Sequence, residues 1–415
     1  MSRPRSAVRA AVALVLAGML VPACGAGGGE SGTETLTWSM WASGSAEQKV
    51  WQQLADRVSA ADPQVRIRLE TSPFNDYFTK LGARLGGEGA PCIVSMQSPR
   101  TAGFAQGMRP LDDLIAKNRL DVSDFDKSIM QGLGFHGKQY ALPYDLGPVI
   151  LTYNKDLFRK AAVPEPKPGW TLAEFESAAR RLTRDGKYGF AASTLDLWML
   201  PMVLTKTGAQ PTDGAGDLRL TTPAMTAGVQ WYTDLVATKK VAPRLPGVDP
   251  TFAETQFLNG QAAMGANGPW ALLDLKKNAG FSVGLTTLPA GPEGSRTYSS
   301  GSGFGISKAC PHPERAFKAI TLMTSRQQLE RLAEVGRAYP SRKSAQHAWY
   351  ENANIPGARA VLEAANATAI PLRTTDDWDQ VTKLLNQYGV SAFNGETSAK
   401  QYLEQVQAQA QAGQG

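Results

Sequence analysis

The sequence has few of the side chains that bind metal ions. Three cysteines and three histidines occur among 415 residues, and His136, His312 and His347 lie far apart along the chain. No cysteine or histidine spacing fits a zinc site. The sequence therefore predicts no metal site, and we expect no cofactor.

A run of basic residues is also missing. The formal net charge is +6, but Arg3, Arg5 and Arg9 lie near the N-terminus. Subtracting these three charges from +6 leaves about +3, and no basic stretch remains that would follow a phosphate backbone. We therefore expect no nucleic-acid partner.

Long apolar runs are absent beyond the N-terminal segment Met1 to Gly29. In that segment, basic residues precede the apolar run Ala10 to Val21, which is too short to span a bilayer as a mature helix. This pattern is typical of a targeting segment. We expect the rest of the chain to fold outside the cytoplasm.

The end of this segment resembles a bacterial lipoprotein signal. Small residues precede Cys24, and glycines follow it. The resemblance implies that residues 1–23 are removed, that a lipid such as palmitate is attached to Cys24, and that residues 24–35 form a flexible tether. An ordinary secretory leader with an incidental cysteine is the alternative.

Two further cysteines, Cys92 and Cys310, remain after the leader. An even number of cysteines in an oxidising compartment permits one disulfide. Two unpaired buried thiols are the alternative, and the residues alone leave both open.

The first hundred residues of the expected mature chain alternate between strands and helices. Alternating or short continuous apolar runs predict strands at 34–41, 65–69 and 92–96. Apolar residues at helical spacing predict helices after Ser45 and at 74–85. This order predicts the α/β class with parallel strands. Because the chain is too long for one ordinary core, we expect two domains.

The remaining elements are predicted in the same way. A capping box at Thr171 to Glu174 opens a helix, and Pro269 suits the first turn of another. We expect further helices at 197–205, 222–235, 252–258 and 314–323 and in the tail after 371. We expect strands at 188–192, 262–264, 281–288 and 303–306, and fraying from 405 to 415.

The stretch 137–158 contains the most unusual pattern. Pro143 and the pair Gly147-Pro148 frame Tyr144 and Asp145 between two predicted strands. An aromatic ring and a carboxylate held between strands suit a binding site. A surface turn with a solvated Asp145 is the alternative.

Short motifs occur in a fixed order between about residues 36 and 400. They are Tyr77–Leu81, Ala90-Pro91, Gly107–Leu114, Leu142–Tyr144, Tyr153–Phe158, Gly169–Thr171, Phe257–Met264 and Gly268–Trp270. Together with the leader, they resemble the extracellular solute-binding proteins of ABC transporters, in the sugar-binding branch that includes maltose-binding protein. Cys92 replaces an aspartate that is usual in this family. That departure favours pairing with Cys310, since the family fold would place both cysteines in the first lobe.

The resemblance implies a two-lobed α/β fold of the periplasmic-binding-protein type with a ligand cleft between the lobes. Lobe 1 is expected at 36–143 with 298–340 returning to it, and lobe 2 at 144–297 with 341–415 returning to it. The stretch around Tyr144 and Asp145 then becomes the first crossing between the lobes. This placement favours a cleft position for both side chains.

A sugar offers C–H groups on its ring faces and hydroxyl groups on its rim, so aromatic rings and polar groups together suit it. For the ring faces we predict Trp41, Trp198, Trp270 and Trp378. For the rim we predict groups that follow strands or lie in the crossing, namely Ser43, Ser45, Gln97, Ser98, Tyr144, Asp145 and Ser302. Arg337 and Arg373 are weaker candidates.

We therefore predict a lipid-anchored receptor that captures a sugar or oligosaccharide and delivers it to an ABC permease, without catalysis and as a monomer. A secreted glycoside hydrolase is an alternative, but it needs a second carboxylate for which the sequence offers no clear residue. No Gly-x-Ser-x-Gly motif occurs either. A binding protein for a non-sugar solute is the third possibility.

Overall fold

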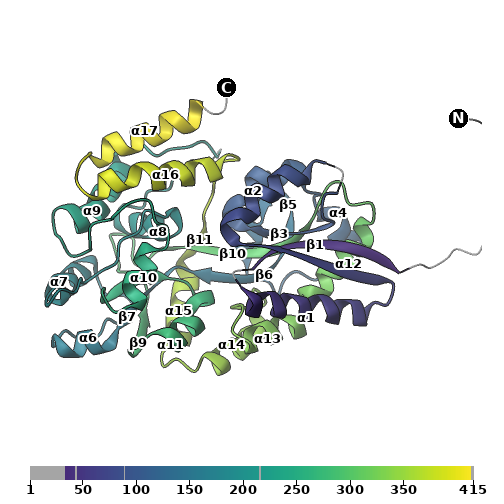
Figure 1. Ribbon diagram of the computed structural model, residues 1–415, viewed down its shortest axis with the longest axis horizontal. Coiled ribbons are helices and arrows are strands. Elements are labelled where there is room, and N and C mark those ends of the chain that lie inside the picture. The colour runs from purple at the N-terminus through teal and green to yellow at the C-terminus, as the bar shows by residue number, and fades with distance from the viewer. Residues whose placement is uncertain (1–32, 43, 88, 215, 413–415) are drawn as a thin grey trace, which may run out of the picture.

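The computed structural model describes residues 33–42, 44–87, 89–214 and 216–412. Two lobes lie side by side in this part of the chain, with lobe 1 on the right and lobe 2 on the left of Figure 1. The predicted signal segment, Cys24 and Ser43 lie outside the described residues. A strand begins at Glu34, so the last two residues of the predicted tether belong to the fold.

Lobe 1 is built on a six-stranded sheet with the order β11-β10-β3-β1-β2 and with β6 paired to β10. Parallel pairing of β1 with β2 and β3 confirms the predicted α/β unit. β10 is antiparallel to β3 and β6. The bounds are β1 (Glu34–Trp41), β2 (Val65–Ser72), β3 (Ile93–Gln97), β6 (Ala141–Pro148), β10 (Thr297–Ile306) and β11 (Ala369–Pro371).

Several helices and one small hairpin join these strands. Before β6 they are α1 (Ser45–Ala61), α2 (Phe74–Leu85), η1 (Ser98–Arg100), α3 (Thr101–Phe104), η2 (Ala105–Gly107), α4 (Asp112–Lys117), α5 (Lys127–Gly132), and the hairpin β4 (Gly134–Phe135) and β5 (Lys138–Gln139). After β10 they are α12 (Pro313–Met323), α13 (Arg326–Glu334), η4 (Lys343–Ala345), α14 (Gln346–Ala353) and α15 (Ala358–Thr368).

Lobe 2 is mainly helical around a three-stranded antiparallel sheet with β7 in the centre. Its strands are β7 (Ile150–Asn154), β8 (Met264–Asn267) and β9 (Val283–Thr286). Its helices are α6 (Lys155–Lys160), α7 (Leu172–Leu182), α8 (Asp196–Thr207), α9 (Pro223–Ala237), α10 (Phe252–Leu258), η3 (Pro269–Ala271), α11 (Leu272–Asn278), α16 (Trp378–Phe393) and α17 (Ala399–Ala412).

Local sequence signals explain many of these bounds. The predicted helices at 74–85 and 252–258 match α2 and α10. The capping box of α7 is present, with Thr171 accepting from the Glu174 amide and the Glu174 carboxylate accepting from the Thr171 amide. In such segments the local pattern is sufficient to fix a helix end.

Two local predictions are wrong. Residues 188–192 form only isolated bridges at Tyr188 and Ala191 instead of a strand. The tail stays helical to Ala412, because Val406 and Ala410 are buried in the core of lobe 2. In both places, tertiary packing decides against a weak local pattern.

The predicted break at Pro143 is also absent, because β6 runs without interruption from lobe 1 into lobe 2. A β-bulge lies at Tyr144, where the pairing with β10 shifts register. On the other edge of β6, Leu146 donates its amide to Tyr339, and Ser341 donates to Tyr144. These bonds keep β6 paired along both edges although Pro143 offers no N–H group.

Buried apolar side chains form two large clusters. The first lies under the sheet of lobe 1 and includes Trp38, Trp51 and Trp349, and the second fills lobe 2. The first cluster also contains Leu272 of α11, so it reaches into lobe 2, and Val361 places α15 against lobe 1. The predicted lobe limits near residue 340 stay a prediction. This packing favours a return of the chain from lobe 1 to lobe 2 at β11, as a third crossing besides β6 and β10.

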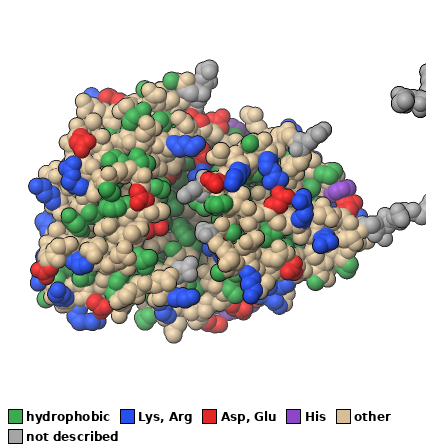
Figure 2. Space-filling model, in the orientation of Figure 1, with side chains coloured by type: hydrophobic (Ala, Val, Ile, Leu, Met, Phe, Trp, Pro, Cys, Tyr) green, Lys and Arg blue, Asp and Glu red, His purple; other side chains and the backbone are tan. Residues whose placement is uncertain are grey.

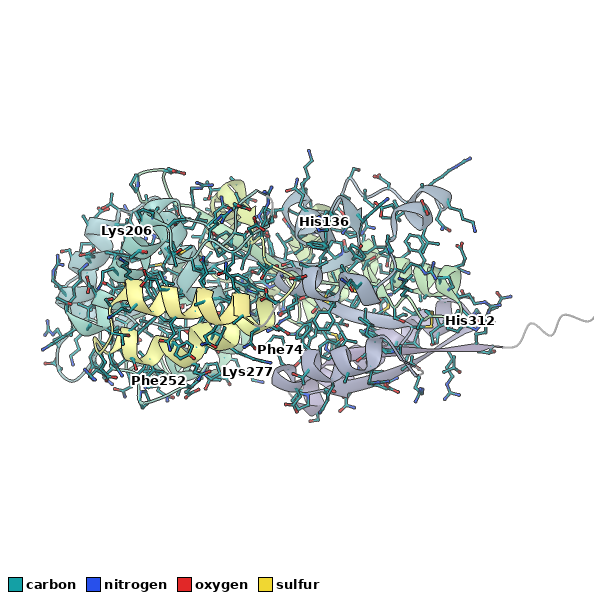
Figure 3. All side chains as sticks on the ribbon, turned by 90° about the horizontal axis from the view of Figure 1, so that it is seen from above. Phe74, His136, Lys206, Phe252, Lys277 and His312 are labelled. Atoms are coloured by element: carbon teal, nitrogen blue, oxygen red, sulfur yellow. A yellow bond between two sulfur atoms is a disulfide. The ribbon has the colours of Figure 1, made fainter. Side chains whose placement is uncertain are left out.

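The structure joins Cys92 to Cys310 by a disulfide within lobe 1. The bond ties the start of β3 to the segment before α12, close to His312 and far from the junction of the lobes (Figure 3). Among the residues that the structure describes, no helix is long and apolar enough to cross a membrane.

Candidate ligand-binding cleft

The surface is hollowed between the two lobes, and hydrophobic side chains form the bottom of the hollow (Figure 2). Phe74 of lobe 1 and Lys277 of lobe 2 lie on the side of the molecule on which the hollow opens, and His136 lies on the opposite side (Figure 3). β6 and β10 cross between the lobes here. A solute in this hollow would contact both lobes at once.

Trp270 is the aromatic residue best placed at the junction. It lies in η3, whose first turn begins with Pro269, and its ring is partly exposed. The ring lies so close to β6 that a Cβ atom at Gly147 would meet it at 2.8 Å. Gly147 is therefore required for this contact, which fixes an indole ring directly on a crossing strand.

Trp198 extends this aromatic surface. It lies on α8, and its ring stacks on Trp270 with centroids 6.0 Å apart and an angle of 24° between the planes. Trp198 is 4% exposed, so Trp270 is the accessible member of the pair. The pair offers one flat aromatic face supported from behind, which suits stacking of a sugar ring.

The face of the crossing strands next to Trp270 is polar. Side chains at positions i and i+2 of a strand point to the same side, so Asp145 shares the face of Gly147. Ser302 and Ser300 pair with these two residues on β10. The Ser302 amide donates to Asp145 Oδ1 at 2.6 Å, and the buried Ser300 hydroxyl has no hydrogen-bond partner in the described part of the chain.

Asp145 lies at the centre of a charged group at this crossing. Burial raises the pKa of its carboxyl to about 7, and Arg337 and the Ser302 amide act in the opposite direction. Arg337 donates to Glu47 Oε1 at 2.8 Å, and its guanidinium lies 5.2 Å from the Trp51 ring centroid. Because Arg337 already pairs with Glu47, it compensates the negative charge of an ionised Asp145 only in part.

A second contact between the lobes lies beside a cavity of about 490 Å³. Arg100 of η1 forms an ion pair with Asp379 of α16. Close to this pair, the Trp378 indole N–H donates to Asp196 at 2.7 Å. The cavity is lined by Gly82, Leu85, Gly86, Arg100, Gly103, Phe104, Gln106, Gly107, Asp376, Trp378 and Asp379.

Not every predicted residue reaches these sites. Trp41 is 5% exposed and is enclosed by the rings of Phe74, Tyr77 and Phe78, so the structure does not bring it to the aromatic pair. Tyr144 is fully buried and stacks on Phe304 instead of facing the hollow.

The predicted polar residues are also divided. Ser45 is exposed at the start of α1, and Ser98 is buried against Gly132. Gln97 Oε1 accepts from Arg100 Nε at 3.2 Å, so Gln97 holds the interlobe arginine in place. The structure therefore brings Trp198, Trp270, Asp145 and Ser302 together at the crossing, and Gln97 and Trp378 near the cavity.

Arg100, Glu47 and Glu254 are not among the residues predicted from the sequence, and Arg337 is only a weaker candidate there. Arg100 follows β3, so the rule that polar residues at the carboxyl ends of strands bind ligands applied to it. Glu47 lies in the first turn of the helix after β1, where a capping role is the usual interpretation. For Glu254 and Arg337 no local signal exists.

Comparison with known proteins matches this chain to one protein family. The family model for bacterial extracellular solute-binding proteins matches residues 41–330. The arabinooligosaccharide-binding protein of Bacillus subtilis is 24% identical over 294 residues, which are 68% of this chain and 67% of that protein.

Solved structures show the same fold. The substrate-binding protein Lmo0181 of Listeria monocytogenes has a TM-score of 0.80 and 22% identity over 92% of this chain and 98% of its own. The GacH receptor of Streptomyces glaucescens has a TM-score of 0.76 and 25% identity over 90% and 96%. The chain belongs to the family of bacterial extracellular solute-binding proteins that serve ABC transporters.

Proposed function

We propose that this protein is the receptor of an ABC importer for a neutral sugar or oligosaccharide. The observation that carries the proposal is the partly exposed Trp270 ring, stacked on Trp198 and set directly on the crossing strand β6. A sugar ring on this indole has Asp145 and the β10 serines on the adjacent strand face for its hydroxyl groups.

The ligands of similar proteins support this choice. The Bacillus protein is named for arabinooligosaccharides, the Listeria structure contains cycloalternan, and GacH was solved with acarbose. These ligands are saccharides or saccharide-like molecules with many hydroxyl groups. An oligosaccharide longer than one ring would extend from Trp270 toward the cavity at Arg100 and Trp378.

Binding works through the arrangement of the lobes. A solute that contacts both lobes favours the closed arrangement by its difference in affinity for the two states. The crossing strands β6 and β10 connect the two lobes, and the Arg100–Asp379 pair is a further contact between them. No covalent chemistry is required.

The proposal includes the location of the protein. Lipidation of Cys24 anchors the chain to the outer side of the cell membrane, and the folded part acts as a monomer that docks on the permease. The family supports an extracellular position, and a lipoprotein from Streptomyces antibioticus is 27% identical over 45% of this chain. Mass spectrometry of the membrane-extracted protein tests the anchor through the acyl mass on an N-terminal Cys24 peptide.

Calorimetric titration of the purified protein with a panel of mono- and oligosaccharides tests the proposal. We expect saturable binding of at least one saccharide, and we expect Trp270→Ala to weaken it at least about tenfold, because stacking on a tryptophan contributes that much to binding. Trp270→Phe should retain part of the affinity. Trp170→Phe is the control, since Trp170 lines neither cavity and donates to Thr287 within lobe 2. Equal affinity of Trp270→Ala and the native protein would rule out this assignment.

Hydrolysis of a glycosidic bond is the competing function that the carboxyl groups of the cleft suggest. Asp145 and Glu254 both have raised pKa values because of desolvation, as the acid of a glycosidase does. A receptor returns its ligand unchanged, so chromatography of an oligosaccharide after prolonged incubation should show no shorter product. Release of shorter sugars that Asp145→Asn abolishes would establish the enzyme instead.

A further inference from the structure

A small cavity in lobe 2 adjoins the aromatic pair at the cleft. We propose that it is a subsite for a single hydroxyl group of the solute, with the Trp198 indole N–H as donor and the Glu254 carboxylate as acceptor. This inference rests on the proposed sugar-binding function and names two residues that would select the sugar.

The size of the cavity limits what can enter. Its volume is about 10 Å³, which corresponds to one oxygen atom with its hydrogen. α8, α10 and β8 supply most of its wall, which consists of Ala191, Ser193, Trp198, Ala253, Glu254, Phe257, Gly265, Ala266 and Asn267. A whole sugar ring does not fit, but one substituent on the ring does.

Trp198 supplies a donor that the protein leaves unused. Its Nε1 atom is buried and has no hydrogen-bond partner in the described part of the chain. Buried N–H groups are nearly always paired in native proteins, so an unpaired one in a cavity wall indicates a group from outside. The same indole stacks on Trp270, so the cavity adjoins the surface on which we place the sugar ring.

Glu254 supplies the acceptor. It comes from the first turn of α10, lines the cavity and belongs to a residue that as a whole is exposed. Desolvation nevertheless raises the pKa of its carboxyl, with the Trp198 N–H acting in the opposite direction. The two groups therefore lie near each other but do not form a hydrogen bond of normal geometry.

The pairing of one donor with one acceptor selects the chemistry of the entering group. A hydroxyl accepts from the indole N–H and donates to the carboxylate at the same time. An ammonium group has no acceptor and would leave the indole unpaired, and an anionic oxygen would face the Glu254 carboxylate. The subsite therefore favours a neutral hydroxyl over an amine, a carboxylate or a phosphate.

Titration calorimetry with the best saccharide from the panel and its monodeoxy analogues tests the subsite. We expect Glu254→Gln and Trp198→Phe each to weaken binding by about tenfold, because the first variant removes the charge from the acceptor and the second removes the N–H donor. One deoxy analogue should bind the native protein about tenfold more weakly than the parent sugar. The difference in affinity between this analogue and the parent should be smaller for Glu254→Gln than for the native protein, because glutamine keeps an acceptor oxygen but lacks the charge that strengthens the bond.

Glu351→Gln is the matched control, since Glu351 is an exposed glutamate on α14 outside both cavities. If the native protein binds no saccharide, the proposed function itself fails. If it binds a saccharide with an affinity that both variants and every deoxy analogue leave unchanged, the subsite is refuted and the cavity holds a structural water. Circular dichroism checks that Trp198→Phe folds. If Trp198→Phe misfolds, the affinity of Glu254→Gln decides whether the subsite exists.

Discussion

The two lobes use tryptophan in different ways near the cleft. Trp41 ends β1 of lobe 1 and is enclosed by three aromatic rings from α2, whereas Trp270 follows β8 of lobe 2 and keeps part of its ring exposed on a crossing strand. Both residues lie at or just after the end of a strand. The difference teaches that helix packing, and not position at a strand end, separates a buried ring from a partly exposed one.

Truncating Trp41 should give the largest effect and should act on stability alone. Trp41→Ala removes a buried ring from the Phe74, Tyr77 and Phe78 cluster, which costs about 3–5 kcal/mol of unfolding free energy. Urea unfolding measures this loss, and calorimetry on the folded fraction should give native affinity. Trp270→Ala should show the reverse pattern. A large loss of saccharide affinity in Trp41→Ala at unchanged stability would show that Trp41 binds the ligand and would contradict the difference proposed between the two lobes.

Removing the disulfide should affect the stability of lobe 1 more than ligand binding. Cys92 and Cys310 enclose a loop with a sequence separation of 218, so reduction should lower the unfolding free energy by about 2–5 kcal/mol. A Cys92→Ser, Cys310→Ser double variant measured by thermal unfolding checks this. Saccharide affinity at 25 °C should stay within about twofold, because the bond lies far from the junction. Loss of binding in a folded double variant would contradict this separation.

Asp145 should make stability depend on pH at the crossing. Its pKa is about 7 in the folded protein and about 4 in an unfolded chain, so the folded state binds the extra proton between these values. The part of the unfolding free energy that comes from protonation of Asp145 is fully present below about pH 4 and is lost as the pH rises through about 7. Asp145→Asn removes this dependence. The melting temperature of the native protein should therefore fall relative to Asp145→Asn between pH 5 and pH 8. Parallel curves for the two proteins would show that Asp145 is ionised throughout.

The Arg100–Asp379 pair should give the smallest effect. It joins the two lobes but is partly solvated, so Asp379→Asn should weaken saccharide binding by no more than about fivefold. Small-angle scattering without ligand should show a larger radius of gyration for this variant, since an interlobe contact is lost. Glu330→Gln, which breaks the exposed Arg326–Glu330 pair within α13, is the control and should change neither quantity. An unchanged radius for Asp379→Asn would mean that this pair does not hold the lobes together.

Much of the fold follows from local pattern. The alternation in β1, the helical spacing in α2 and the capping box of α7 specify these elements because their own residues carry the signal. β6 does not follow its local pattern, because β10 and the segment 339–341 form hydrogen bonds along both of its edges although Pro143 has no N–H to donate. Local signals fail where partners distant in sequence decide.

The candidate site follows the same division. The Gly-Pro-Trp motif predicted a site role for Trp270, because the motif carries both the turn and the ring. Glu254 and Arg337 carry no such signal. Their roles depend on Trp198 and Glu47, which lie 56 and 290 positions away by subtraction of residue numbers. A sequence pattern cannot report such a pairing.

The sequence by itself determined the alternation of strands and helices, the order of the motifs and the residue types available for binding a sugar, because each is written in short stretches of chain. Tertiary structure alone decided which indole stays exposed, which carboxyl is desolvated and which N–H remains unpaired. These properties depend on burial, and burial depends on packing between segments that are remote in the chain.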